Sequence, residues 1–476
     1  MKENARQAPA ARDAGFIYAH GTTLYEYDRP FRFISWNVPN IHALEDNPER
    51  WEQAPTPREQ GEAVGTSDAF GKDALASVHQ MLGRVIRTYT LSVGHKRHIE
   101  APGKLSEELF RGLDCALAIA PKYNIRVIIP FIDQWDWHGG IKEFAAFRGK
   151  REIEFWTDPT IRQDFKNVIH QVIHRRNTAT GVLYRDDPTI LGWETGNELG
   201  GWDFNRDLSA WTLDVCAYIR SVDRNHLIID GTLGTRNQHW AKEVLHSPYI
   251  DVLDNHYYSP RGTDDYANQA KADLKVAKKY NKALIIGEFG LAPPRVMEVM
   301  LDAVVNNVEI AGALIWSLRF HSEQGGFYTH TESDGYLSYH HPGFPEAEGF
   351  HRDEEMVMKM MRSYSAKIQC QNTSVIPPPA PPHLFPTCDT KLRWRGSAGA
   401  CHYEMWRMDG DVNAQNGNWR LVADRVMDNV KYGSWMYEDR DLCRGGVYTY
   451  AVVAVSEGGK SPYSNTVVVR VPCGDC

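Results

Sequence analysis

Short apolar segments and helical patterns alternate eight times along this chain. Each segment is five to nine residues long, and the helical patterns between them repeat apolar residues at intervals of three and four. In chain order the segments are Phe31–Asn37, Arg84–Ser92, Arg126–Asp133, Ile190–Glu198, Leu227–Gly231, Ile250–Tyr258, Ala283–Phe289 and Ile310–Ser317. Eight strands that are each followed by a helix predict a (β/α)₈ TIM barrel of the α/β class, in which a functional site lies at the carboxyl ends of the strands.

An open, doubly wound sheet is the other fold that alternates strands with helices. That fold normally carries a glycine-rich phosphate loop after its first strand, and no such loop follows Phe31–Asn37. Local signals also support the expected helices, because Asp158 and Pro159 are a good N-cap and first-turn pair for the helix before the fourth strand. Thr22–Tyr27 and Pro30–Asn37 indicate a hairpin that leads into the first strand. We therefore expect the barrel.

Charge and composition exclude several classes of partner. The net charge of −8 over 476 residues argues against a nucleic-acid partner. No apolar run reaches the length of about 18 residues that a membrane span needs. Residues 1–15 are polar and alanine-rich, without the apolar region of a signal peptide, so they are expected to be an N-terminal extension. We expect a monomer with no nucleic-acid partner and no membrane span.

The eight cysteines are unevenly distributed. Cys115 and Cys216 stand alone within helical patterns, which favours buried free thiols. The other six lie in the last quarter of the chain: Cys370, Cys388, Cys401, Cys443, Cys473 and Cys476. We expect these six to form disulfides, in pairs that the sequence does not specify, and the protein to be secreted or periplasmic.

The chain after the barrel has a different composition. Val375–Pro386 reads VIPPPAPPHLFP, a composition typical of an extended, semi-rigid linker. Alternating apolar residues then predict short strands, and Tyr448–Asn465 resembles the closing hairpin of a fibronectin type III module. We expect four parts: an extension at 1–15, the barrel at 16–370, a linker at 371–386 and a fibronectin type III-like β-sandwich at 387–476.

Two glutamates stand at the ends of two of the predicted barrel strands. Gly192–Trp202 reads GWETGNELGGW and contains Glu198, and Ala283–Gly290 reads ALIIGEFG and contains Glu288. A single glutamate at a strand end is usually a solvated loop residue. Two of them at the same edge of a barrel indicate a pair of carboxyl groups for acid/base and nucleophilic chemistry on one bond.

Other polar and aromatic residues gather at the same ends of the predicted strands. Hydrogen-bonding groups beside flat aromatic rings suit the hydroxyls and the C–H face of a sugar. Candidates for this surface, in chain order, are Trp36, Asn37, Arg87, Asp133, Trp135, Trp137, Asn197, Trp202, His256, Tyr258 and Trp316. No set of histidines, cysteines or carboxylates has metal-ligand spacing, so we expect no metal and no organic cofactor.

These strand ends resemble glycoside hydrolase family 5, and most of all its β-mannanases. The similarity runs through residues 155–198, FWTDPTIRQDFKNVIHQVIHRRNTATGVLYRDDPTILGWETGNE. It also includes VIRTYTLS around Arg87, FIDQWDWHGG around Trp135, DNHYYSP around His256 and Tyr258, and IIGEFGL around Glu288. Overall it covers roughly residues 16–365. The family commonly has Asn-Glu-Pro where this chain has Asn-Glu-Leu199, and Asn-Asn-Trp where this chain has Asp-Gln-Trp135.

The resemblance implies a role for each matched residue. Glu198 would be the acid/base and Glu288 the nucleophile of a retaining mechanism. Arg87, Asn197, His256, Tyr258 and Trp316 would line the subsite where the bond breaks, and we expect Trp135 to bind the substrate with them. The positions of Trp36, Asn37, Asp133, Trp137 and Trp202 at the strand ends make them possible further subsite residues. We expect Glu288 to be ionised by virtue of Tyr258 and Arg87, and Glu198 to titrate at high pH.

The sequence therefore predicts a retaining β-glycosidase that hydrolyses β-1,4-mannosidic bonds in mannan-type polysaccharides or oligosaccharides. An exo-acting β-mannosidase or a β-1,4-glucanase on the same scaffold is the alternative within the enzyme class. A catalytically silent carbohydrate-binding protein is the alternative outside it, and the presence of both glutamates favours the enzyme.

Overall fold

The structure is a computed structural model that describes residues 14–42, 72–203, 207–233, 240–262, 265–387, 390–411 and 418–472. The chain divides into two compact units. The barrel unit comprises Met1–Gly71, Leu82–Ser317 and Tyr364–Gln371, and the second unit comprises Lys72–Met81, Leu318–Ser363 and Asn372–Cys476.

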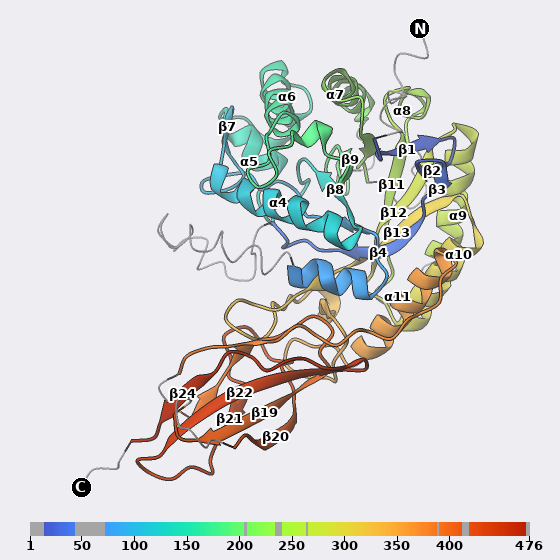
Figure 1. The fold of residues 1–476 in the computed structure, drawn as a ribbon. Helices are drawn as coiled ribbons and strands as arrows, with labels where there is room; N and C mark the ends of the chain where they lie inside the picture. The colour runs from blue at the N-terminus through green and yellow to red at the C-terminus, as the bar shows by residue number, and fades with distance from the viewer. Residues whose placement is uncertain are drawn as a thin grey trace. The chain divides into compact units, whose positions relative to one another are not determined.

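The barrel unit contains a closed barrel of parallel strands, so the predicted (β/α)₈ barrel is confirmed (Figure 1). Its strands, in chain order, are β4 (Phe33–Asn37), β5 (Val85–Arg87), β8 (Arg126–Pro130), β9 (Ile190–Glu194), β10 (Leu227–Asp230), β11 (Val252–Tyr258), β12 (Ala283–Gly290) and β13 (Ile310–Trp316). Every neighbouring pair is parallel, and β13 pairs with β4 to close the ring. Each strand lies within or close to the segment expected from the sequence.

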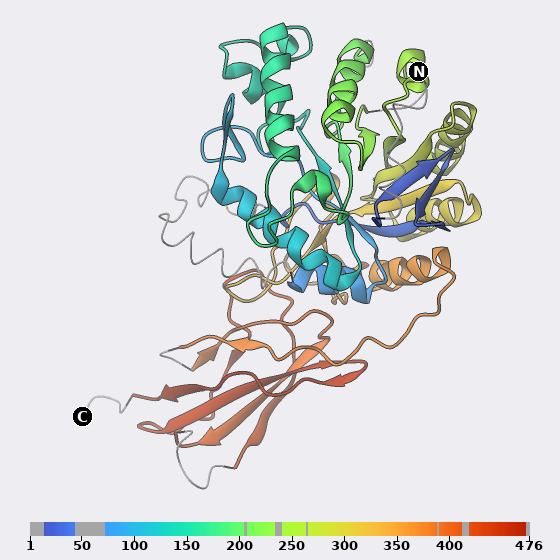
Figure 2. The same ribbon diagram turned by 45° about the horizontal axis from the view of Figure 1, so that its top comes forward.

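Helices follow the strands in the order that the sequence predicts. They are α4 (Glu107–Ile119), α5 (Ile141–Ala146), α6 (Pro159–Ile173), α7 (Ser209–Val222), α8 (Lys242–His246), α9 (Tyr266–Lys279), α10 (Pro294–Asn306) and α11 (Glu354–Ile368), and residues 72–80 form a further helix between β4 and β5. In Figure 2 the strands meet at the centre of the barrel unit and α4 to α10 surround them. Asp158 caps α6 as expected, because its carboxylate accepts hydrogen bonds from the backbone of Thr160 and Ile161.

The N-terminal hairpin differs from the expectation. The chain forms a three-stranded antiparallel sheet of β1 (Ile17–His20), β2 (Thr23–Glu26) and β3 (Arg29–Pro30), and the first barrel strand is not part of it. Glu26 of β2 binds Arg84, which precedes β5, and Arg126, which begins β8. This sheet therefore lies at the amino-terminal end of the barrel. Ile17 and Leu24 pack into the buried apolar core there, which leaves the carboxyl ends of the strands as the place for a site.

The second unit contains an all-β region. Its main sheet has the order β20-β19-β22-β23, with β24 also paired to β22. The strands of the whole all-β region are β16 (His383–Leu384), β17 (Lys391–Leu392), β18 (Trp394–Arg395), β19 (His402–Asp409), β20 (Arg420–Val426), β21 (Tyr437–Glu438), β22 (Val447–Ser456), β23 (Gly459–Lys460) and β24 (Val467–Arg470). Short two-stranded sheets join β16 to β18 and β17 to β21. Alternating residues such as Trp394, Tyr403 and Tyr450 are fully buried in one core, which explains the alternation in the sequence.

The proline-rich tract is packed rather than free. Ile376 is buried, and its backbone N–H donates to Glu457 at 2.6 Å. Ser456 donates to the carbonyl of Pro377 at 3.0 Å, and Leu384 pairs with Trp394 across β16 and β18. The tract is extended because its prolines exclude a helix, but its contacts attach it to the β region.

The expectation that all six late cysteines form disulfides is wrong for three of them. Cys370, Cys401 and Cys443 are free thiols, as are Cys115 and Cys216, whereas Cys388, Cys473 and Cys476 lie outside the described residues. The backbone N–H of Cys401 donates to the carbonyl of Val455 on β22, and the backbone N–H of Cys443 donates to the hydroxyl of Tyr448 near the other end of that strand. Seven residues of strand separate the two ends by about 20 Å, far beyond the reach of a disulfide of about 7 Å between Cα atoms.

A buried ionic contact joins three distant segments of the second unit. His321 Nδ1 lies 3.0 Å from Asp73 Oδ2, and His321 Nε2 lies 3.0 Å from Asp428 Oδ2. Burial alone would lower the pKa of His321, but the two carboxylates outweigh it and raise that pKa to about 10. The imidazole is therefore protonated at neutral pH and links the helix at 72–80 to the β region.

We predict that this contact makes the stability of the protein depend on pH. The folded pKa of His321 exceeds the unfolded value of about 6.5, so its stabilisation is complete below that value and is lost as the pH rises through about 10. His321→Asn should lower the free energy of unfolding at pH 7 by about 3 to 5 kcal/mol, because it leaves two buried carboxylates without a cation. Denaturant unfolding between pH 7 and pH 10 measures both effects. The exposed His20→Asn is the control, and an equal pH dependence in wild type and His321→Asn would contradict the prediction.

No helix in the described part of the chain is both long and apolar enough to cross a membrane.

Candidate active site

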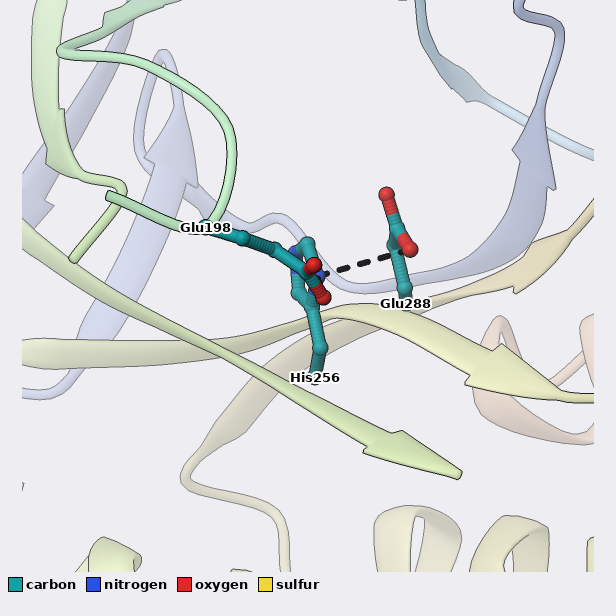
Figure 3. A group of neighbouring side chains, drawn as sticks. All are labelled: Glu198, His256 and Glu288. Atoms are coloured by element: carbon teal, nitrogen blue, oxygen red, sulfur yellow. Dashed lines mark hydrogen bonds and ion pairs between the residues drawn. The ribbon is translucent and has the colours of Figure 1, made fainter. Parts of the chain in front are cut away.

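The two predicted glutamates meet at the carboxyl end of the barrel. Glu288 lies near the end of β12, and Glu198 lies in the loop that begins where β9 ends. Figure 3 shows both carboxylates pointing toward the imidazole of His256 on β11. One carboxylate oxygen of each glutamate and one nitrogen of His256 all lie within 4.8 Å of one another. Strand ends that are about 90 residues apart in the sequence thus form one cluster.

Arg87, at the end of β5, holds several of these groups in place. Its guanidinium donates two hydrogen bonds to Glu194, at 2.7 and 2.8 Å, and one to Glu288 at 2.8 Å. A further N–H donates to Asn197 Oδ1 at 2.8 Å. Arg87 is fully buried, so its positive charge acts on the carboxylates from beneath the surface.

Each catalytic candidate has a second set of partners. The hydroxyl of Tyr258 donates to Glu288 Oε2. Trp135 Nε1 donates to Glu198 Oε2 at 2.6 Å, and His256 Nδ1 lies 2.8 Å from Glu198 Oε1. Glu198 has a left-handed backbone with φ of 50°, a conformation that L-residues rarely adopt and that is often retained at functional sites.

A local irregularity in the barrel positions Glu288. The register between β11 and β12 shifts so that Asn255 pairs with Ile286 but His256 pairs with Glu288. Gly287, in between, donates to Asp254 Oδ1 at 2.6 Å, and a Cβ at this position would lie 2.1 Å from Asp254 Oδ2. Glycine is therefore required immediately before Glu288, as is common at β-bulges beside functional sites.

The pKa shifts of the two glutamates are opposite to those expected from the sequence. Burial raises the pKa of Glu288 to about 7, and the opposing effects of His256 and Arg87 do not cancel it. Burial also acts to raise the pKa of Glu198, but the hydrogen bond and charge of His256 and the bond from Trp135 outweigh it and leave that pKa below its ordinary value. The contacts expected for Glu288 are present. The direction of both shifts was nevertheless wrong, because the sequence reveals neither the burial of Glu288 nor the charge of His256 beside Glu198.

His256 is the source of that charge. Burial acts to lower its pKa, but Glu288, Asp254 and Glu198 outweigh burial and raise the pKa well above the usual value. Asp254 Oδ2 lies 3.4 Å from Nε2 of the ring. The imidazole is therefore a cation that carries a proton next to Glu198.

Aromatic side chains surround this cluster. Tyr89 makes edge contacts with Trp137 at 4.7 Å and with Trp316 at 5.7 Å between ring centroids. Trp135 lies 5.7 Å from Trp202, whose side chain is 68% exposed. The rings provide flat apolar faces beside the hydrogen-bonding groups.

Three of the candidate subsite residues are instead fully buried. Trp36, Asn37 and Asp133 have no exposed surface, so their side chains do not form the surface that a substrate would touch. Asn37 donates to the carbonyl of Gly287 at 2.8 Å, and Asp133 accepts a bond from Asn197 at 3.0 Å. Alternation along a strand indicates which residues share a face, but it does not distinguish the outermost residue from the one beneath it.

Glu194, which binds Arg87, belongs to the network although it was not among the candidates, and so do Tyr89 and Asp254. Tyr89 donates to Asp133 Oδ2 at 2.6 Å, and Asp254 supports both His256 and Gly287. Each stands two positions from a candidate on the same strand end, Tyr89 after Arg87 and Asp254 before His256. Because side chains two apart share a face, this spacing could have identified them.

Glu198, His256 and Glu288 are also close enough together to offer three ligands to a metal ion. Each of them already has hydrogen-bond partners, and the guanidinium of Arg87 lies 2.8 Å from Glu288. Two protein cations at this position oppose the binding of a third. The expectation of a metal-free site stays a prediction.

A separate cavity of about 400 Å³ lies beside α9 and α10 in the barrel unit. Its lining includes Tyr266, Phe289 and Arg295, and none of the described residues that line it is a predicted site residue. The catalytic candidates are therefore identified by their chemistry rather than by the volume of a pocket.

Comparison with known proteins places this site in a family. Residues 89–302 match the family described as GH family 5 beta-mannosidase-like. Mannan endo-1,4-beta-mannosidase 7 of Arabidopsis thaliana is 30% identical over 304 residues, which cover 53% of this chain and 70% of that protein. Mannan endo-1,4-beta-mannosidase 1 of Oryza sativa subsp. japonica is 33% identical over 317 residues, covering 58% of this chain and 68% of that protein.

Solved structures share the fold. A glycoside hydrolase family 5 mannosidase from Rhizomucor miehei superposes with a TM-score of 0.60 at 18% identity, over 75% of this chain and 98% of that one. The endo-beta-1,4-mannanase from Thermotoga petrophila gives a TM-score of 0.56 at 19% identity, over 93% of this chain and 98% of that one. The sequence relatives and the family match show that the chain belongs to glycoside hydrolase family 5 and is a glycosidase, and the two converging glutamates agree with this.

Proposed function

We propose that this enzyme hydrolyses β-1,4-mannosidic bonds within mannan-type polysaccharides or oligosaccharides and retains the anomeric configuration. The observation that carries the proposal is the pair of carboxylates, Glu198 and Glu288, with an oxygen of each within 4.8 Å of the other. Retaining glycosidases place their carboxyl groups about 5 to 5.5 Å apart, whereas inverting enzymes need about 6.5 to 9.5 Å to admit a water. The names of the plant relatives support mannan as the substrate.

Glu288 is the proposed nucleophile. Its Oε1 is bound by Arg87 and its Oε2 by Tyr258, so the carboxylate is held in one orientation before a sugar arrives. Attack on the anomeric carbon forms a covalent glycosyl-enzyme and breaks the bond to the leaving oxygen. The positive charge of Arg87 disperses the charge of Glu288 when deglycosylation releases the carboxylate.

Glu198 is the proposed acid/base, and the protonated His256 bears on how it acts. The raised pKa of His256 places the proton on the imidazole, 2.8 Å from Glu198 Oε1. Transfer along this bond converts the ion pair into a neutral acid and a neutral ring. Glu198 can then protonate the leaving oxygen, and afterwards it can accept a proton from the attacking water.

Substrate contacts are assigned to members of the cluster whose side chains retain some accessible surface. Asn197, Tyr258 and Trp316 stand at three strand ends around the carboxylates and are proposed to bind the sugar whose bond breaks. Trp137 contacts Trp316 at 6.1 Å between ring centroids and extends the aromatic surface. Asn37 and Asp133 are proposed to hold these residues in place, since they are buried beneath them.

The domain organisation is proposed as residues 1–15 for an extension, 16–370 for the catalytic domain, 371–386 for the proline-rich tract and 387–476 for a fibronectin type III-like sandwich. The strands β19, β20 and β22 pair in one sheet, and buried residues of β19 and β22 share a core with residues of β16, β17 and β18, which supports the sandwich. Because residues 318–363 fall in the same compact unit as the sandwich, a structural role for this module is favoured over sugar binding. A secreted or periplasmic location stays a prediction.

Product analysis tests the substrate and the position of cleavage. The enzyme is incubated separately with mannohexaose and with cellohexaose. It should cleave mannohexaose at internal bonds, with mannobiose and mannotriose as early products. Release of mannose alone from one end would replace the endo assignment with an exo-acting β-mannosidase. Preferential cleavage of the cello-oligosaccharide would replace it with a β-1,4-glucanase, and no cleavage of either would favour a silent binding protein.

We predict that the first product keeps the β configuration. The closeness of the carboxylates of Glu198 and Glu288 leaves no room for an inverting water between them. Proton NMR of the anomeric signals during the first minutes of mannohexaose hydrolysis should show the β anomer before mutarotation. An α anomer as the initial product would contradict the retaining mechanism.

A further inference from the structure

Trp202 is a large aromatic residue that the fold leaves exposed next to the proposed acid/base. Its side chain is 68% exposed, although burial of an indole would normally stabilise a folded protein substantially. It follows Glu198 by four residues, in the loop after β9. An exposed aromatic ring beside a catalytic group is a candidate for contact with a ligand.

The loop that carries Trp202 is attached to the barrel at its base. The backbone of Leu199 donates to Gly231 at 3.0 Å and accepts from Leu233 at 3.0 Å. Gly200 donates to Gln134 Oε1 at 2.8 Å. These hydrogen bonds hold the loop at the residues just before Trp202.

The turn before Trp202 also requires glycine. Gly200 and Gly201 have φ of 94° and 54°, in the region that glycine adopts without strain. A Cβ at Gly201 would lie 3.1 Å from Gln134 Cγ and 3.3 Å from Trp135 Cη2, tighter than ordinary contact. This close approach brings Trp202 beside Trp135, with 5.7 Å between the ring centroids and an angle of 43° between the planes.

The contacts of Glu198 show on which side of the reacting bond Trp202 lies. Glu198 Oε1 faces His256, which also lies 3.4 Å from the nucleophile Glu288. Glu198 Oε2 has a different partner, the indole N–H of Trp135, which donates to it at 2.6 Å, and Trp202 lies against Trp135. The nucleophile must lie next to the anomeric carbon and the acid next to the leaving oxygen, so the Trp135 side belongs to the leaving group.

We propose that Trp202 determines specificity by stacking on a sugar ring of the leaving group. The inference rests on the proposed function of Glu198 and Glu288. The exposed face of the indole suits the apolar C–H face of a pyranose, whereas Trp135 orients the acid/base through its N–H. Trp202 thereby favours substrates in which a chain of sugars continues beyond the bond that breaks.

The test compares substrates with and without a sugar in the leaving group. Trp202→Ala should lower kcat/KM on mannohexaose about tenfold, the size of one aromatic contact, mainly through a higher KM. It should leave kcat/KM on β-mannobiosyl fluoride within about twofold, because fluoride offers no ring to stack. Trp202→Phe should retain most of the activity on mannohexaose. Trp435→Ala, which removes another exposed indole, is the matched control and should leave kcat/KM unchanged on both substrates.

Two results would overturn the proposal. Equal losses on mannohexaose and on the fluoride would mean that Trp202 acts on the acid/base or on folding, and wild-type rates on mannohexaose would mean that the ring contacts no sugar. A wrong assignment of mannan as the substrate would be distinguishable from both of these results. If the wild-type enzyme cleaves cellohexaose instead of mannohexaose, the same comparison on cellohexaose still decides the role of Trp202.

Discussion

Glu288→Ala is expected to reduce kcat on mannohexaose by about 10⁴-fold or more. Without this carboxylate no covalent intermediate forms, and no other group is placed to substitute. Glu194, which shares the guanidinium of Arg87 with Glu288, is fully buried and cannot reach a sugar. Initial-rate kinetics on mannohexaose and on a dinitrophenyl β-mannobioside measure the loss, which should appear with both substrates because both need the nucleophile.

Two variants control this experiment. Glu288→Gln keeps the shape of the side chain. An equal loss of activity with an unchanged free energy of unfolding would show that the loss comes from the missing carboxylate and not from altered packing. Glu298→Ala removes an exposed glutamate from α10 and should leave kcat unchanged. Activity of Glu288→Ala within about 100-fold of wild type would contradict the assignment of the nucleophile.

The barrel was predictable because its signals are local. Continuous apolar runs such as Leu227–Asp230 and Ile310–Trp316 identify strands that are buried on both faces. The capping pair Asp158-Pro159 identifies the start of α6. Because parallel barrel strands present their carboxyl ends at one edge, the positions of Glu198 and Glu288 follow once the strands are recognised.

The position of the N-terminal hairpin was not predictable in the same way. Thr23–Glu26 was recognised as a strand, and it does pair with Arg29–Pro30 at the start of the predicted second arm, but it also pairs with Ile17–His20, and the barrel strand begins only at Phe33. Its place at the amino-terminal end of the barrel depends on the ion pairs of Glu26 with Arg84 and Arg126, which are about 60 and 100 residues away in the sequence. Pattern reasoning does not detect pairings over such separations.

The electrostatics of the site were the least predictable part. Tyr258 and Arg87 were correctly expected to contact Glu288, yet burial sets the direction of its pKa shift. The opposite shift of Glu198 depends on the 2.8 Å contact with His256, and the charge of His256 depends in turn on Glu288 and Asp254. A pKa depends on the distance and burial of all neighbouring charges together, and a sequence supplies neither.

The second unit shows a related limit. A proline-rich tract and a β pattern correctly indicate a change in the chain after the barrel. The contact of His321 with Asp73 and Asp428 assigns residues from the helix at 72–80 and from the loop after β13 to the same compact unit. Patterns read along the sequence do not indicate that segments so far apart belong to one unit.

Glu198→Ala is expected to separate the two chemical steps. On mannohexaose the loss of general acid catalysis should lower kcat by about 10² to 10⁴-fold. A dinitrophenyl β-mannobioside has a leaving group that needs no proton, so Glu288 should still be glycosylated and one equivalent of dinitrophenolate should be released rapidly. The intermediate should then accumulate, because water lacks the base that activates it. Mass spectrometry of the intact protein measures the intermediate.

Azide should rescue this variant, and the residues around Glu198 explain why. The alanine leaves a space bordered by the indole N–H of Trp135 and the imidazole of His256, both of which pointed at the lost carboxylate. These donors suit a small anion, and azide needs no general base to attack the glycosyl-enzyme. The expected product is the β-mannobiosyl azide, formed by a second inversion at the anomeric carbon. If azide instead rescued Glu288→Ala and gave the α-azide, while Glu198→Ala released no burst, the roles of the two glutamates would be reversed.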